Sequence, residues 1–171
     1  MTDGGPAAII GMGGLSAAGR GVAPQLQTIY AGRRQPQAPA QLRGDRAEPP
    51  VAFELDRDLV ADDLDGLPDD TQMLRTTKLA VIAARDAVAD AGLQPAELRA
   101  QPVGVCVGTT VGCALNIDDF HRDYYAGQEP DTANVHRFVR SNPAAAIAGD
   151  LGVTGPRQTI ANACAAGTDA I

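Results

Sequence analysis

The chain has 171 residues, of which 44% are hydrophobic and 20% are charged, as is typical of a globular domain with an ordinary core. Its net charge of −7, without a basic cluster, argues against a nucleic-acid-binding protein. Its three scattered cysteines form neither a disulfide framework nor a zinc-site spacing, and no apolar run reaches the length of a membrane span, so we expect a cytoplasmic protein with no membrane segment and no metal.

The first part of the chain alternates apolar runs with loops. Residues 7–16 are an apolar run that breaks into glycines, which predicts a buried strand and a tight loop. Residues 21–34 predict a short helix, and a proline-rich loop follows over 35–50. Residues 51–55 alternate as a strand does, whereas the acidic stretch 56–70 indicates irregular surface.

The clearest helix is predicted over residues 76–93. Leu79, Ala83 and Ala87 recur at a spacing of four residues and define one apolar stripe. Gly92 stands where a left-handed residue ends a helix. The sequence therefore predicts one long amphipathic helix in the middle of the chain.

The second part continues the alternation of strands and helices. Residues 102–112 predict a buried strand, with Cys106 in the core, that leaves through a glycine loop. Helices are predicted over 116–127 and 142–152, on either side of a polar connector, and a turn and a strand lead to Cys164. This order predicts an α/β fold with a mostly parallel sheet.

Cys164 is a candidate nucleophile, because residues 158–162 can form a strand and residues 164–171 can begin a helix. A sharp strand-to-helix turn presents a side chain at its apex, and the free N–H groups of a helix start favour a thiolate. The flanking alanines leave room for the turn, and Gly167 permits a close backbone approach. The Cys164 backbone N–H could also stabilise an oxyanion. A buried structural cysteine is the alternative that this local pattern leaves open.

Four segments resemble, in order, those of β-ketoacyl synthases of the thiolase superfamily. "LGVTGPRQTIANACAAGTDAI" resembles their active-site segment, with its Gly-Pro turn, apolar strand, Ala-Cys and small residues. "AAIIGMGGLSAAG", "AVIAARDAVADAGL" and "VGVCVGTTVG" resemble their opening strand, long first-half helix and glycine-loop strand. The resemblance implies a thiolase-like α/β fold, of which residues 1–171 are an incomplete N-terminal ketosynthase domain, truncated after the nucleophile elbow.

The resemblance also implies a reaction. Such enzymes transfer an acyl chain from acyl carrier protein to the cysteine, here Cys164, and condense it with malonyl-carrier protein, with loss of CO₂, in fatty acid or polyketide biosynthesis. It implies acyl carrier protein as partner, a homodimer or ketosynthase heterodimer at full length, and no cofactor. By position, Val111 is expected to line the acyl pocket, and Phe138 is expected to approach the partner subunit's pocket across the dimer interface.

In this family the two catalytic histidines, a supporting lysine and the second oxyanion donor come from a C-terminal half, which this sequence does not contain. His121, His136 and Lys78 match no family motif for those roles, so we expect surface positions for them. We therefore expect the chain alone to be inactive. Two alternatives stay open: a non-catalytic subunit or fragment that needs a second polypeptide, and another thiolase-superfamily condensing enzyme.

Overall fold

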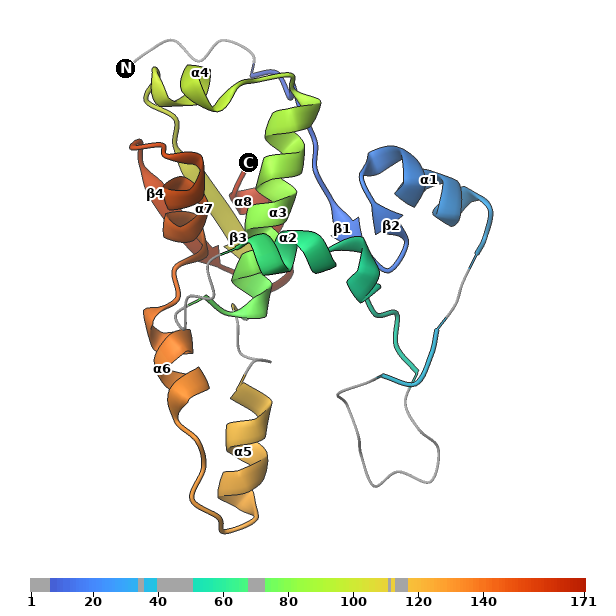
Figure 1. Cartoon of the computed structure of the whole chain (residues 1–171), viewed down its shortest axis with the longest axis vertical. Coiled ribbons are helices and arrows are strands. Elements are labelled where there is room, and N and C mark those ends of the chain that lie inside the picture. The colour runs from blue at the N-terminus through green and yellow to red at the C-terminus, as the bar shows by residue number, and fades with distance from the viewer. Residues whose placement is uncertain (1–6, 34–35, 40–50, 68–72, 111, 113–116) are drawn as a thin grey trace.

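The computed structural model describes residues 7–33, 36–39, 51–67, 73–110, 112 and 117–171. Short helices and strands alternate along these residues (Figure 1). In chain order they are β1 (Leu15–Ser16), β2 (Gly19–Arg20), α1 (Val22–Tyr30), η1 (Arg57–Leu59), α2 (Ala61–Gly66), α3 (Arg75–Asp90), α4 (Pro95–Arg99), β3 (Val105–Thr109), α5 (Asp118–Tyr125), α6 (Ala133–Arg140), α7 (Pro143–Leu151), β4 (Arg157–Ala161), η3 (Ala163–Ala165) and α8 (Ala166–Asp169).

The centre of the fold is the parallel pair β3 and β4, whose register runs from Val105 opposite Arg157 to Thr109 opposite Ala161. Helices α3 and α7 pack together over one face of this pair. The core between these layers is built around Val81 and Ile82 of α3 and Ile147 of α7. The predicted α/β architecture with a parallel sheet is confirmed for the described part of the chain.

Helix α3 agrees closely with the helix predicted over residues 76–93. It spans Arg75–Asp90, and its buried residues Thr77, Val81 and Ile82 face the core. Gly92 follows with a φ of +67°, as the predicted left-handed end of the helix requires. Alanines along this helix allow the backbone of the N-terminal segment to approach it closely.

The strand predicted over residues 7–16 is wrong except at its end, where Leu15–Ser16 pairs with Gly19–Arg20 in a small antiparallel hairpin. Residues 7–14 instead run without regular structure against α3. A Cβ on Gly11 would lie 2.3 Å from the Ala87 carbonyl oxygen, and one on Gly13 would lie 2.1 Å from that of Ala83. These glycines therefore serve backbone-to-helix contact rather than a turn after a strand.

Residues 51–70 also differ from prediction. Ala52 forms only an isolated bridge with Gln37, so there is no strand over 51–55. The stretch expected to be irregular contains η1 and α2, and it buries Val60 and Leu67 in the core. Val60, Leu64 and Leu67 recur at helical spacing and pack on the core. The segment is therefore amphipathic, with its acidic residues on the outer face.

Helices α5 and α6 form an arm that extends from the body, while the hairpin and α1 lie on the far side of α3 from α7 (Figure 1). The connector predicted between 127 and 142 is partly wrong, because it contains α6. The sequence reading also missed the short helix α4. Across the described ranges, every helix is too short or too polar to cross a bilayer.

Candidate functional site

Cys164 lies on a strand-to-helix turn, as the sequence predicts. Strand β4 ends at Ala161, the 3₁₀ turn η3 holds Cys164 at its centre, and α8 begins at Ala166. The cysteine is exposed and is not in a disulfide. The turn therefore presents the thiol at the molecular surface rather than in the core.

The backbone of this turn is unusual at Ala163, which has a φ of +43°. Among the described residues, all others with a positive φ are glycines. The left-handed region costs roughly 1–2 kcal/mol for a residue with a Cβ. A non-glycine residue in such a conformation persists only where its surroundings hold it.

Close packing of β3 against the start of α8 supports the turn that contains Cys164. A Cβ on Gly108 would lie 2.1 Å from the Ala166 carbonyl oxygen and 2.8 Å from the Gly167 nitrogen. Only glycine therefore allows the strand and helix backbones to approach this closely. The expected close approach at Gly167 is present, but it depends on Gly108, since a Cβ on Gly167 itself would meet nothing within 4 Å.

The loop after β3 contacts the elbow. The Thr110 hydroxyl donates to the Ala163 carbonyl oxygen at 3.4 Å, and the Thr109 hydroxyl accepts from the Gly112 N–H at 2.9 Å. Val111, the predicted acyl-pocket residue, lies outside the described residues. Thr110, which precedes it, lies next to the residue before Cys164.

Phe138, the second predicted pocket residue, is half-buried on α6. Its ring edge lies 3.8 Å from the position that a Cβ on Gly112 would occupy. Thr110 thus lies at the elbow, and Gly112 lies near the Phe138 ring.

Cys106 is exposed, so its predicted core position is wrong. Alternate residues of a strand point to opposite faces. Val105 and Val107 pack on the core beneath α3 and α7, and Cys106 points to the opposite face. On that face α8 packs against Gly108, two residues further along the strand. The sequence alternation was clear, but it did not show which face is covered.

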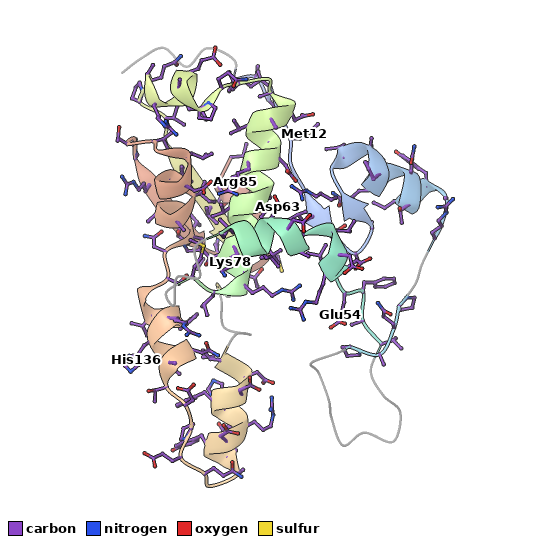
Figure 2. All side chains as sticks on the ribbon, viewed as in Figure 1. Met12, Glu54, Asp63, Lys78, Arg85 and His136 are labelled. Atoms are coloured by element: carbon purple, nitrogen blue, oxygen red, sulfur yellow. The ribbon has the colours of Figure 1, made fainter. Side chains whose placement is uncertain are left out.

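The histidines lie on the arm, as expected for surface residues. His121 is exposed on α5 and stacks on Tyr125, with ring centroids 6.4 Å apart. His136 is exposed on α6, where Figure 2 shows its side chain projecting outward. Lys78 is partly buried in the first turn of α3. Within the described ranges, no group of three histidine, cysteine or acidic side chains could hold a metal ion.

Two ion-pair groups tie α3 to its neighbours. Arg20 donates to the Asp86 carboxylate at 2.9 and 2.7 Å and to Asp63 of α2. Hydrogen bonds to Asp86 and Asp63 raise the pKa of Arg20, and the bond from Arg20 lowers the pKa of Asp63. Arg85 donates to Asp150 of α7 at 2.8 Å, which raises the pKa of Arg85. These pairs connect structural elements and do not touch the elbow.

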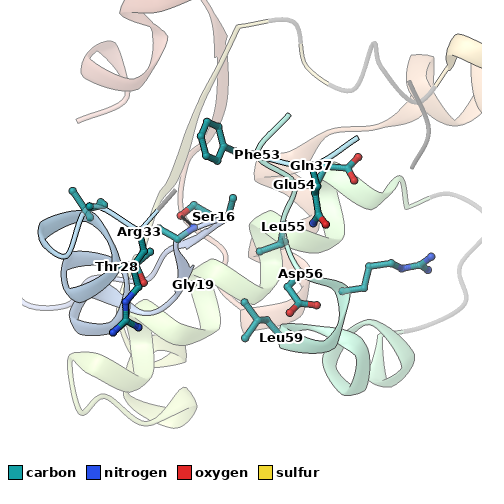
Figure 3. A pocket seen from close by; sticks show the side chains of 15 residues that line it. Ser16, Gly19, Thr28, Arg33, Gln37, Phe53, Glu54, Leu55, Asp56 and Leu59 are labelled. Carbon is teal, nitrogen blue, oxygen red and sulfur yellow. Dashed lines mark hydrogen bonds between the residues drawn. The ribbon is translucent and has the colours of Figure 1, made fainter. Parts of the chain in front are cut away.

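A cavity of about 1070 Å³ lies among the hairpin, α1 and residues 53–59 (Figure 3). Its lining combines polar side chains such as Thr28 and Arg33 with apolar ones such as Phe53 and Leu55. Cys164 is not among the lining residues. The cavity is therefore separate from the elbow and contributes nothing to the candidate site.

Comparison with known proteins supports one family. The family described as "Beta-ketoacyl synthase, N-terminal domain" matches residues 5–171. The chain is 29% identical over 171 residues to the tetracenomycin polyketide synthase ketoacyl synthase alpha subunit of Streptomyces glaucescens, covering 95% of this chain and 40% of that protein. It is 27% identical over 165 residues to 3-oxoacyl-[acyl-carrier-protein] synthase 2 of Staphylococcus aureus, covering 95% of this chain and 41% of that protein.

Solved structures agree on the fold. The ishigamide ketosynthase/chain length factor superposes with a TM-score of 0.75 at 25% identity, over 90% of this chain and 39% of that chain. A β-ketoacyl synthase from Burkholderia phymatum superposes with a TM-score of 0.61 at 22% identity, over 94% of this chain and 40% of that chain. The chain spans about 40% of the length of the curated relatives that it matches. The predicted family is confirmed: the chain belongs to the β-ketoacyl synthases and corresponds to their N-terminal domain.

Proposed function

We propose that this chain carries the acyl-accepting part of a β-ketoacyl-[acyl-carrier-protein] synthase, with Cys164 as the nucleophile. The observation that carries the proposal is the position of Cys164, exposed on a strand-to-helix turn within the region matched by the family. The named relatives act in polyketide and fatty acid synthesis. We assign this protein to the same class of carbon–carbon bond formation.

In the proposed first step, the Cys164 thiolate attacks the thioester carbonyl of an acyl chain on acyl carrier protein. A C–S bond to Cys164 forms, and the carrier thiolate leaves and takes up a proton. In the second step, malonyl-carrier protein loses CO₂, and the resulting carbanion attacks the acyl-cysteine carbonyl. The Cys164 thiolate is then released. The Cys164 backbone N–H is the proposed oxyanion donor of this chain.

The acyl pocket around this thiol is proposed to include Val111. Its neighbour Thr110 contacts the residue before Cys164. Pairing of two ketosynthase-type subunits, through which Phe138 would approach a partner's pocket, is part of the proposal, as is action in the cytoplasm.

The test is acyl transfer in the protein at its full natural length. We expect an acyl thioester to label the peptide that contains Cys164, and Cys164→Ala to abolish the label. Cys106→Ser is a matched control, because Cys106 is also an exposed free cysteine but lies on β3, away from the turn. It should label as the unaltered protein does. Equal acylation of the Cys164→Ala variant would refute the assignment.

A second candidate is a catalytically incomplete subunit that needs another polypeptide. The relative in Streptomyces glaucescens is named an alpha subunit, and one structural neighbour is a ketosynthase/chain length factor. Assaying the protein at its full natural length, alone and together with a second ketosynthase-type subunit, distinguishes the two candidates. Acylation that appears only with the second subunit supports a requirement for another polypeptide, and acylation without it supports the first candidate.

A further inference from the structure

The strained turn at Cys164 needs groups that hold it in place. Ala163 has its φ of +43° immediately before the cysteine. The 3₁₀ hydrogen bond from the Ala165 N–H to the Asn162 carbonyl closes the turn at 3.0 Å. This bond spans only the turn itself, and the Thr110 bond to the Ala163 carbonyl is long. Neither bond ties the strand that enters the turn to the helix that leaves it.

The side chains of Asn162 and Asp169 make that connection. The Asn162 amide donates to the Asp169 carboxylate at 2.6 Å, across seven residues of chain. Asn162 follows the last residue of β4, and Asp169 lies in α8. The bond therefore closes a ring around the segment that contains Ala163 and Cys164. The bond lies at the surface, with both residues exposed, and its acceptor is a carboxylate.

We propose that Asn162 and Asp169 form a clamp that positions the Cys164 thiol for acyl transfer. The inference rests on the proposed role of Cys164 as acyl acceptor. Both are positioning residues, because they act through the backbone of the turn. Without the clamp, Ala163 relaxes toward an ordinary φ, and the thiol leaves the apex of the turn. Reactivity falls because the reacting atoms must be aligned closely.

The variants that test the clamp are Asn162→Ala, Asp169→Ala and the double variant, in the protein at its full natural length. Thr168→Ala is the matched control on the same helix. We expect each single variant to slow acylation of Cys164 by a short acyl thioester about three- to tenfold, through kcat rather than KM. The double variant should be no slower than the singles, since both remove the same bond.

Alkylation by iodoacetamide, followed peptide by peptide, gives a second measurement that does not depend on acyl transfer. Cys106 is the internal reference, because it is exposed on β3. The rate ratio of Cys164 to Cys106 should fall threefold or more in both single variants and stay constant in Thr168→Ala. Because Cys106 is already exposed, a general loss of structure is checked separately, by the circular dichroism spectrum of each variant.

The outcomes separate the two proposals. If the unaltered protein is acylated at Cys164 but the clamp variants match it in rate and in alkylation ratio, the clamp is refuted and the proposed function stands. If the unaltered protein is not acylated but the alkylation ratio falls in both variants, the function is refuted and, with it, the role of the clamp in acyl transfer; Asn162 and Asp169 then only hold the turn. Additive losses in the double variant also refute the clamp.

Discussion

Replacing Gly108 by alanine adds one methyl group where β3 lies against α8. Its Cβ would stand 2.1 Å from the Ala166 carbonyl oxygen, whereas ordinary contact begins at 3.4 Å, so the backbones must separate by about 1.3 Å. The atoms in the way belong to the backbone, which has no alternative rotamer. Overpacking of this kind typically costs about 1–3 kcal/mol. A shift of about 1 Å at a reacting group can cost about 10²-fold in rate.

The assay compares the free energy of unfolding in urea with the rate of Cys164 acylation. Gly149→Ala in α7 is the control, because a Cβ there meets nothing within 4 Å. It should leave the acylation rate unchanged and stabilise the helix by up to about 1 kcal/mol. If Gly108→Ala also keeps the stability and acylation rate of the unaltered protein, the inferred contact between β3 and α8 is wrong.

The remaining predictions concern stability. The pKa of Asp63 is lowered in the folded state by its hydrogen bond from Arg20. This pairing therefore stabilises the fold at pH values above 3.8, the ordinary pKa of the group, and the stabilisation is lost as the pH falls through the lowered pKa of the folded state. Arg20→Gln should therefore lower the free energy of unfolding by about 1 kcal/mol at pH 7 and by progressively less as the pH is lowered below 3.8, and a loss that does not change with pH contradicts this role. The 171-residue chain alone should be poorly soluble or partly unfolded, since Ile9, Ile10 and Met12 are 76%, 67% and 53% exposed; a monodisperse monomer with a sharp thermal transition in sedimentation and melting experiments would contradict this.

The sequence predicted well those features whose local pattern is compatible with only one type of secondary structure. The helix ending at Gly92 combines a long apolar stripe with a left-handed end, and no strand has that spacing. The turn at Cys164 combines a strand, small residues and a Gly-Pro lead-in. Both depend on neighbours in sequence, so both were accessible before any tertiary contact was known.

The features that sequence missed depend on which surface is covered. An apolar run ending in Gly11 and Gly13 suits either a strand or a segment lying against a helix, and only α3 decides between them. The stripe of Val60 and Leu67 was hidden by the acidic residues around it. At Cys106 the alternation identified two faces, but the position of α3 and α7 determined which of them is buried.

The site follows the same division. Cys164 could be placed on its turn from local sequence, whereas the contact of Gly108 with α8 joins residues 58 positions apart. An amide and a carboxylate flank the cysteine turn in the sequence. That they form a hydrogen bond depends on the direction in which α8 leaves the turn. Val111 stays a prediction, because it lies outside the described residues.

The Arg20 ion pairs have a consequence for synthesis on the ribosome. Arg20 is synthesised 66 residues before its partner Asp86. At about 5–20 residues per second, roughly 3–13 s pass between the two. Throughout that interval the hairpin has no helix α3 on which to dock. The hairpin therefore leaves the ribosome well before the helix that fixes its position.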